Sequence, residues 1–351
     1  MTEPHPSKTA HPRPDPASPT LATKDLHTHL IPPGWEDWAT KFGGERWPRL
    51  VERDACHATI MTGEQFFRDV DDRSWSAPRR IEDMDRLGIG RQALSPPPVM
   101  FCYWADARAT EAFARMQNEN VAGVVGRHPD RFVGMATVPL QDPALAVKEL
   151  RYCRERLGLR AVEIGSCPAG RDFDDPALFP FFEACAELDV AAFVHPAVPL
   201  VGQERLTKYY FPLIVGNPLE TALAASKLIY GGVLERLPQL RVCFAHGGGA
   251  FPYTVGRIEH GFIARPDLCA LENNINPREY LGKFYVDSLV HDADALRLLL
   301  KMVGEERIAL GSDYPFPLGE AIPGELVHKT PMSDSDKELV FSGSAKEWLG
   351  I

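Results

Sequence analysis

Short apolar runs alternate with longer amphipathic segments along most of the chain. Eight of these runs are rich in β-branched and apolar residues and predict strands at residues 23–30, 91–96, 133–140, 159–166, 190–196, 241–248, 284–292 and 308–315. Helical periodicity occurs between most of them, at residues 79–88, 109–128, 142–158, 175–189, 218–237 and 292–304. This alternation is typical of a parallel sheet that is covered by helices.

The number of predicted strands indicates the architecture. Eight strands that alternate with helices predict an α/β protein with a TIM-like (β/α)8 barrel, whose catalytic groups lie at the carboxyl ends of the strands. A doubly wound sheet is the alternative, but no GxGxxG motif follows the first predicted strand. A chain of 351 residues fits one such barrel with insertions.

Two segments fall outside the regular alternation. The connection at about residues 31–78 contains four tryptophans and the stretch HATIMTGEQFFRDVD, which predicts a small hairpin insertion that turns near Gly63. Loops of this length often cap a site. The first 23 residues are rich in Pro, Ser and Thr, so we expect a flexible tail before a single barrel domain at 24–351.

Composition and charge exclude several classes of protein. The chain is 44% hydrophobic and 25% charged, which is typical of a soluble globular protein. Its formal charge is −10 and it has no dense Lys/Arg run, so we expect neither nucleic acid nor membrane as a partner. The seven cysteines are scattered without a CxxC motif, which indicates reduced thiols and a cytoplasmic protein.

Histidines and an aspartate recur where the predicted strands end. In DLHTHL, His27 and His29 occupy alternate positions, so in a strand their side chains point the same way. His195 ends the fifth predicted strand, His246 the sixth and Asp313 the eighth. One such residue alone would more often be structural, but five at one rim of a barrel indicate a site.

This set of side chains suits a metal ion. Three neutral imidazoles and a carboxylate are ligands that Zn²⁺ accepts, and the remaining imidazole is then free to handle a proton. A metal of this kind lowers the pKa of a bound water toward ~7. His291, at the end of the seventh predicted strand, either lines the site or ties down a loop.

The combination of HxH, a further histidine and a strand-end aspartate resembles the amidohydrolase superfamily. Longer stretches resemble the α-amino-β-carboxymuconate-ε-semialdehyde decarboxylases, among them RRIEDMDRLGIGRQALS, RFVGMATVPLQDPALAVKEL, VCFAHGGGAFPYTVGRIEHGFIARPDLCA, NPREYLGKFYVDSLVHD and LGSDYPFPLGE. The similarity runs from about Asp25 to the end of the chain. It implies a non-oxidative carboxy-lyase that acts on 2-amino-3-carboxymuconate 6-semialdehyde or a close analogue.

The resemblance also implies roles for the strand-end residues. Zinc would be bound by His27, His29, His195 and Asp313, although another divalent metal is an alternative. The fourth predicted strand, LRAVEIGS, lacks the lysine of two-metal members, which implies one metal per subunit. His246 would deprotonate the metal-bound water, and the hydroxide would add to the substrate before CO2 is lost.

Substrate contacts follow from the same resemblance. Arg68 in the insertion, and Arg257 and Arg265 after the HGGG motif, would bind the carboxylates of the substrate, and Phe316 would pack on it. One of these arginines would come from a neighbouring subunit, which implies a homodimer.

Three departures from the family leave the substrate open. Ala197 replaces the tryptophan of HPWDM, Leu213 replaces a second tryptophan, and Thr62 replaces a lysine in the hairpin. The alternatives are decarboxylation of a hydroxylated aromatic acid of the resorcylate or dihydroxypicolinate type, metal-dependent hydrolysis, and a non-catalytic barrel with structural zinc. The last is disfavoured because structural zinc sites usually include thiolates, and no cysteine is among the predicted ligands.

Overall fold

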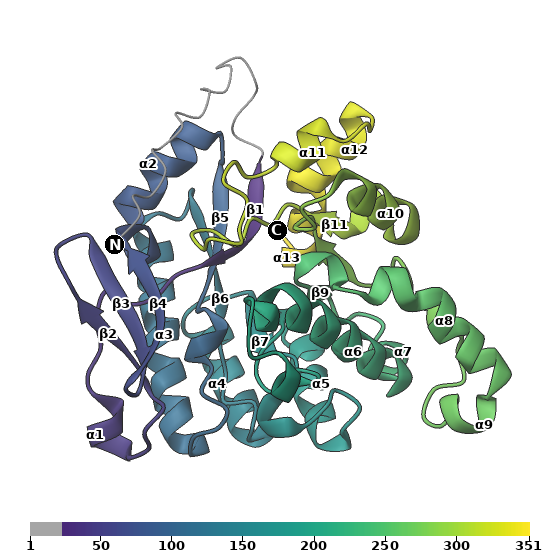
Figure 1. Ribbon diagram of the computed structural model, residues 1–351, viewed down its shortest axis with the longest axis horizontal. Coiled ribbons are helices and arrows are strands. Elements are labelled where there is room, and N and C mark those ends of the chain that lie inside the picture. Colours follow the sequence, from purple (N-terminus) through teal and green to yellow (C-terminus); the bar gives the residue numbers. More distant parts are fainter. Residues whose placement is uncertain (1–22) are drawn as a thin grey trace.

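The computed structural model describes residues 23–351 (Figure 1). Apart from Thr23, the predicted tail lies outside the described residues. Eight parallel strands form one sheet in the order β1 (Lys24–His29), β5 (Arg91–Ser95), β6 (Phe132–Ala136), β7 (Ala161–Gly165), β8 (Ala191–His195), β9 (Val242–Phe244), β10 (Tyr285–Asp287) and β11 (Ile308–Ala309). All eight predicted strands are present in the predicted order, and the (β/α)8 prediction is confirmed.

The first and last strands meet and close the barrel almost completely. The backbone N–H of Leu26 in β1 donates to the carbonyl of Leu310 at 2.7 Å, and Thr28 forms a parallel bridge with Tyr314. Side chains that point into the barrel form a cluster of their own, which includes Met135, Phe193 and the fully buried Trp348.

Most of the helices cover the outside of the barrel, whereas α1 (Trp38–Phe42) lies in the insertion and α8 (Phe251–Ala264) and α9 (Pro266–Cys269) extend outward (Figure 1). The larger hydrophobic cluster lies between the helices and the strands. The other helices are α2 (Ala77–Leu87), α3 (Ala107–Arg127), α4 (Pro143–Glu155), α5 (Phe179–Glu187), α6 (Asn217–Tyr230), α7 (Val233–Arg236), α10 (Ala293–Val303), α11 (Glu325–Lys329), α12 (Asp334–Glu338) and α13 (Ser344–Leu349). Aspartates begin several of them: the side chains of Asp106, Asp142 and Asp292 each accept two backbone N–H groups.

The last three strands are shorter than their predicted runs. β9 and β10 have three residues each and β11 has two. His246 and Asp313, expected at strand ends, instead lie in the turns that follow, with φ angles of 56° and 57°. An extended strand excludes these angles, so the chain leaves the sheet before it reaches either residue.

The insertion after β1 forms the predicted hairpin and adds one strand to it. β3 (His57–Thr62) and β4 (Gln65–Asp71) pair across a turn at Gly63, and β2 (Pro48–Glu52) pairs with β3 in an antiparallel sheet. Gly63 has a φ of 57°, and a Cβ there would lie 1.8 Å from the carbonyl oxygen of Glu45. Another residue at this turn would therefore force the backbone to move.

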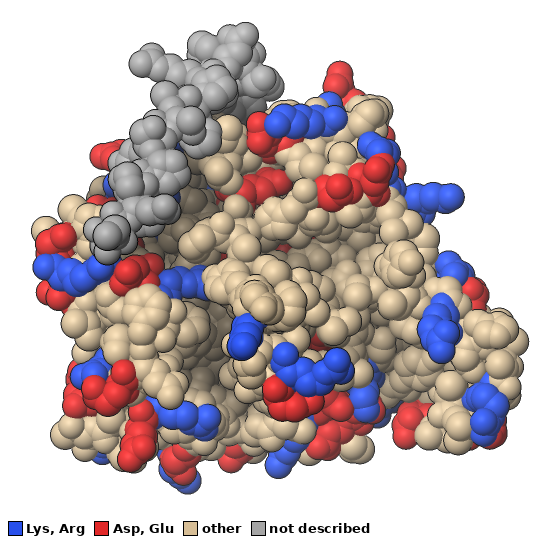
Figure 2. Space-filling view, in the orientation of Figure 1, with Lys and Arg blue, Asp and Glu red and all other residues tan. Residues whose placement is uncertain are grey.

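The surface fits the charge expected from composition. Figure 2 shows Lys and Arg side chains interspersed with Asp and Glu over the visible face, without a continuous basic patch. Within residues 23–351, no helix is long and apolar enough to span a membrane. The seven cysteines are all unpaired.

Candidate metal centre

Four of the predicted residues converge at the carboxyl end of the barrel. His27 and His29 come from the end of β1, His195 from the end of β8, and Asp313 from the turn after β11. One ligand atom from each lies within 4.8 Å of the others, and all four residues are buried. The Nε2 atoms of His27 and His29 are 3.3 Å apart, and Asp313 Oδ1 lies 3.1 Å from His29 Nε2. We call these residues the metal cluster.

The polar atoms of the metal cluster fit a divalent cation. Asp313 Oδ1 is buried and makes no hydrogen bond within the described residues. His195 Nδ1 donates to the carbonyl of Pro196 at 2.9 Å, which leaves Nε2 of that ring as the atom with a free lone pair. Imidazole nitrogens and a carboxylate oxygen that converge in this way match the ligands of Zn²⁺ and similar ions.

Asp287, which follows the motif FYV in the chain, supports two histidines at once. Its carboxylate accepts from His27 Nδ1 at 2.7 Å and from the backbone N–H groups of His246 and Gly247 at 2.9 and 2.8 Å. Burial alone would lower the pKa of His27, but this hydrogen bond and the charge of Asp313 outweigh it and raise the pKa to about 9. We did not predict this residue, because it lies in the middle of the seventh predicted strand, although a carboxylate within a largely apolar strand is a signal that could have found it.

His246 lies beside the metal cluster without belonging to it. Its ring centroid is 5.0 Å from that of His195 and 5.3 Å from that of His27. Its Nδ1 atom is buried and makes no hydrogen bond within the described residues. Burial, followed by the charge of His27, lowers the pKa of His246, so the ring is neutral at pH 7 and can accept a proton.

A buried arginine is hydrogen-bonded to the end of β1, the strand that carries His27 and His29. Arg80 in α2 is fully buried and donates to the backbone carbonyl of His29 at 2.7 Å and to Thr28 Oγ1 at 2.8 Å. It also donates to the carbonyl of Arg73 at 3.0 Å. This guanidinium therefore fixes the end of β1 against α2 and against the end of the insertion.

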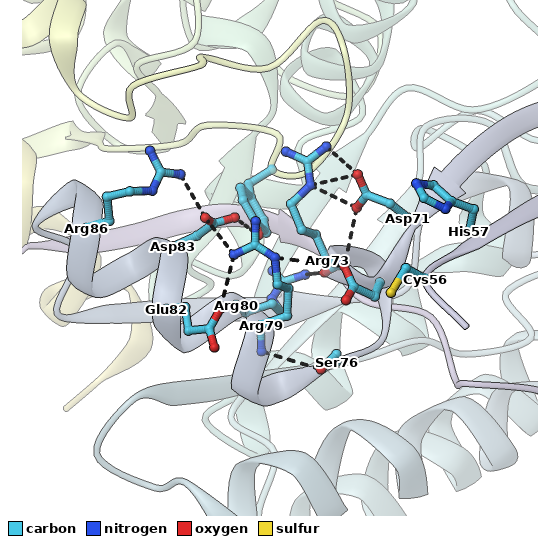
Figure 3. A network of polar contacts seen from close by, with 12 residues as sticks. Cys56, His57, Asp71, Arg73, Ser76, Arg79, Arg80, Glu82, Asp83 and Arg86 are labelled. Atoms are coloured by element: carbon cyan, nitrogen blue, oxygen red, sulfur yellow. Dashed lines mark hydrogen bonds and ion pairs between the residues drawn. The ribbon is translucent and has the colours of Figure 1, made fainter. Parts of the chain in front are cut away.

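Further ion pairs surround Arg80, as Figure 3 shows. Asp83 accepts from Arg79 at 3.0 Å and from Arg86 at 2.7 Å, and its other oxygen accepts from the hydroxyl of Tyr314 at 2.9 Å. Because Tyr314 follows Asp313 directly, these contacts join α2 to the turn that presents a member of the metal cluster.

A second buried carboxylate holds the same turn. Asp25 accepts from the backbone N–H of Ser312 at 3.0 Å and from its hydroxyl at 2.5 Å. The backbone N–H of Asp313 donates to the carbonyl of His27 at 2.8 Å. These bonds keep Asp313 in the left-handed conformation, which costs a non-glycine residue on the order of 1–3 kcal/mol.

Two of the predicted substrate-binding residues lie next to the metal cluster. The ring of Phe316 is 5.2 Å from that of His29, between centroids. The guanidinium carbon of Arg68, in β4 of the insertion, is 4.3 Å from the Phe316 ring centroid. Arg68 also donates to the hydroxyl of Tyr210 at 3.3 Å. We call Arg68, Tyr210 and Phe316 the outer group.

Within the described residues, the other two predicted arginines do not contact the outer group or the metal cluster of their own subunit. Arg257 and Arg265 are exposed on α8 and just after it, and α8 projects away from the barrel toward α9 (Figure 1). Arg265 forms an ion pair with Asp267 at 2.7 Å. His291, whose role was left open, is exposed just after β10.

The three positions at which the chain departs from the family, Ala197, Leu213 and Thr62, differ in their surroundings. Ala197 is buried, and its methyl group and the ring of Tyr103 both lie against the Cα of Gly165. Tyr103 and Phe101 are therefore aromatic residues near Ala197, whereas Tyr210 and Phe211 are 48% and 37% exposed. Leu213 and Thr62 are both partly buried.

Comparison with known proteins extends this description. The amidohydrolase family (Amidohydro_2) matches residues 25–351. The chain is 48% identical to 2-amino-3-carboxymuconate-6-semialdehyde decarboxylase of Dictyostelium discoideum, over 93% of this chain and 91% of that protein. It is 35% identical to the decarboxylase of the same name from Caenorhabditis elegans, over 93% and 94% of the two chains.

Several solved structures have the same fold. Dihydroxybenzoic acid decarboxylase from Polaromonas sp. JS666, with bound manganese and the inhibitor 2-nitroresorcinol, superposes with a TM-score of 0.76. The two sequences are 22% identical, and the match covers 94% of this chain and 97% of that one.

Proposed function

This chain belongs to the amidohydrolase family, and from that premise we propose that it is a non-oxidative decarboxylase of 2-amino-3-carboxymuconate 6-semialdehyde. The observation that carries the proposal is the metal cluster with His246 beside it, in a chain 48% identical to a decarboxylase of that substrate. Such an enzyme is a carboxy-lyase.

We assign His27, His29, His195 and Asp313 as ligands of one divalent metal ion, and zinc is our first choice. The unpartnered oxygen of Asp313 and the 3.3 Å approach of two Nε2 atoms support this assignment. When bound, the metal would supply the Lewis acidity that makes a water molecule acidic enough to react near neutral pH.

The chain's own side chains would then move the proton and hold the substrate. Neutral His246 would accept the proton of the attacking water while the hydroxyl adds to the conjugated substrate, and it would return this proton to the carbon that carries the departing carboxylate. Loss of CO2 from that carbon would re-form the double bond and expel the added hydroxyl, so that the net change is replacement of the carboxylate by a proton. Arg68 would hold a substrate carboxylate through charge-assisted hydrogen bonds, and Phe316 would pack against the conjugated chain. Because Arg68 and Phe316 are already in contact, both can touch the same small molecule.

We also propose a homodimer in which Arg257 of one subunit completes the site of the other. Arg257 is exposed and makes no hydrogen bond or ion pair within the described residues of its own subunit. Around it, α8, α9 and the residues after them expose large apolar side chains, with exposed fractions of 84% for Tyr253, 64% for Ile263 and 68% for Leu271. Contiguous exposed apolar side chains are typical of an interaction surface.

The second candidate is decarboxylation of a hydroxylated aromatic acid. It is favoured by Ala197 and Leu213, which stand where the family has tryptophans, because smaller side chains change the shape of the site around the substrate. Retention of Arg68 next to Phe316 favours the muconate semialdehyde instead.

The test is an assay with purified protein that has been freed of metal and reloaded with Zn²⁺. The muconate semialdehyde is made fresh from 3-hydroxyanthranilate, its absorbance is followed, and released CO2 is trapped. Faster loss of absorbance with a matching amount of CO2 is the expected result. Acid release without CO2 would indicate a hydrolase, and CO2 release from resorcylate alone would select the second candidate.

A further inference from the structure

A fully buried carboxylate lies inside the barrel beneath His29. Glu163 is in the middle of β7, and neither of its carboxylate oxygens makes a hydrogen bond within the described residues. Its Oε2 atom is 3.9 Å from Nδ1 of His29. The functional roles proposed above do not use this residue.

The side chain of Glu163 points into the barrel interior, because side chains alternate along β7. Ala161 belongs to the cluster inside the barrel, whereas Val162 and Ile164 belong to the cluster between strands and helices. Because side chains alternate along a strand, Glu163 points inward with Ala161. An inward carboxyl group among apolar side chains is costly without polar partners, and its polar neighbours among the described residues are the hydroxyl of Ser95 and the imidazole of His29.

Among the three histidines of the metal cluster, His29 has the longest polar contacts at its second nitrogen. His27 Nδ1 donates to Asp287 at 2.7 Å, and His195 Nδ1 donates to the carbonyl of Pro196 at 2.9 Å. For His29 Nδ1, the described neighbours are Ser95 Oγ at 3.5 Å and Glu163 at 3.9 Å. The hydroxyl of Ser95 is itself a donor to the carbonyl of Thr28, at 3.1 Å.

We propose that Glu163 is a positioning residue that accepts a hydrogen bond from the Nδ1–H of His29 and so fixes the ring with Nε2 toward the metal. This role rests on the metal centre of the proposed function. The carboxylate oxygens of Glu163 do not belong to the set of ligand atoms that lie within 4.8 Å of one another. Glu163 therefore acts through His29 rather than as a ligand. A carboxylate in this position makes the imidazole a stronger ligand, and loss of such partners typically weakens metal binding about 10–100-fold.

The test measures metal affinity directly. Metal-free parent protein and the variants Glu163→Leu, Glu163→Gln and Ser95→Ala are titrated with Zn²⁺ against a competing chelator, and the visible absorption spectrum is recorded with Co²⁺ in place of zinc. Glu149→Gln is the control, because Glu149 is equally buried but pairs with Arg115 on the outer helices. Thermal unfolding of each metal-free protein reports damage to the fold.

We expect Glu163→Leu to raise the Kd for Zn²⁺ about 10–100-fold and to change the Co²⁺ spectrum. Glu163→Gln should recover most of the affinity, because its amide oxygen still accepts a hydrogen bond. Glu149→Gln should lower the melting temperature without changing the Kd for Zn²⁺. The role is overturned if Glu163→Leu binds Zn²⁺ as the parent does, or if Ser95→Ala weakens binding more. Failure of the parent itself to bind Zn²⁺, Mn²⁺ or Co²⁺ would instead remove the metal centre of the proposed function, and this role with it.

Discussion

The metal cluster and the outer group are neighbours, but they are built in different ways. The residues of the metal cluster come from strand ends and one turn, and their orientation is set by buried bonds of 2.5–3.0 Å to Asp287, Asp25, Arg80 and Pro196. The outer group comes from the insertion and from connecting loops, and a 3.3 Å hydrogen bond and a ring contact join its members. The metal cluster is therefore held rigidly, whereas the outer group lies on segments that can change independently.

The metal cluster and the outer group also differ in solvent exposure. Electrostatic interactions among the buried residues act at a low effective dielectric constant, whereas those of Arg68 and Tyr210 are weakened by water. The departures from the family, at Ala197, Leu213 and Thr62, lie outside the metal cluster and leave it intact. Substitutions should therefore affect catalysis most at the centre and substrate affinity most at the outer group.

The largest effect is expected for His246→Ala. Loss of the proposed base should lower kcat about 10²–10⁴-fold, while the zinc content stays near one ion per subunit, because the metal cluster remains complete. Steady-state kinetics and metal analysis of the same preparation would check both statements. If zinc content fell in step with activity, His246 would be a ligand.

A smaller effect, mainly on KM, is expected for Arg68→Ala. Removal of a charged donor that binds a substrate carboxylate should lower kcat/KM about 10–100-fold, with most of the change in KM. Arg49→Ala is the matched control, since Arg49 lies on the same small sheet but pairs with Glu64 on the surface. Equal KM values for the two variants would place Arg68 outside the substrate site.

Asp83→Asn tests the hydrogen bonds that join α2 to the turn carrying Asp313. Burial by itself raises the pKa of Asp83, but the hydrogen bonds from Arg86 and Tyr314 outweigh it and hold the pKa below its usual range. A lowered pKa gives stability that is present above the unfolded value of about 3.9 and is lost as pH falls through the folded value.

The variant should therefore be about 1–2 kcal/mol less stable than the parent at pH 7, and this difference should shrink below about pH 4. Urea unfolding at pH 7, 5 and 3 gives the measurement. A difference that stayed constant down to pH 3 would show that the charge of Asp83 is not what stabilises the turn.

The smallest effect is expected for Tyr210→Phe. Its hydroxyl touches Arg68 at 3.3 Å from a half-exposed loop, so its loss should raise KM only about 2–5-fold and leave kcat unchanged. Tyr209→Phe, at the neighbouring residue that is 76% exposed, is the control. A large fall in kcat for Tyr210→Phe would mean that this loop takes part in the chemistry.

The sequence by itself determined the barrel and the members of the metal cluster. Apolar runs of strand length report which segments enter the sheet, and the alternation of side chains along a strand places His27 and His29 on one face wherever that strand is packed. The family resemblance then assigned His195 and Asp313, and the structure brings all four together. These inferences succeed because each depends on a local pattern or on the shared rim of a parallel barrel.

Only the tertiary structure decided what supports those residues. Asp287 lies 260 positions from His27 in the chain, Arg80 lies 51 from His29, and Glu163 meets His29 only across the barrel interior. The structure also added β2 to the predicted hairpin and moved His246 and Asp313 from strand ends into left-handed turns. A local pattern reports the face on which a side chain lies, but its partner is fixed only when the barrel closes and brings distant strands into register.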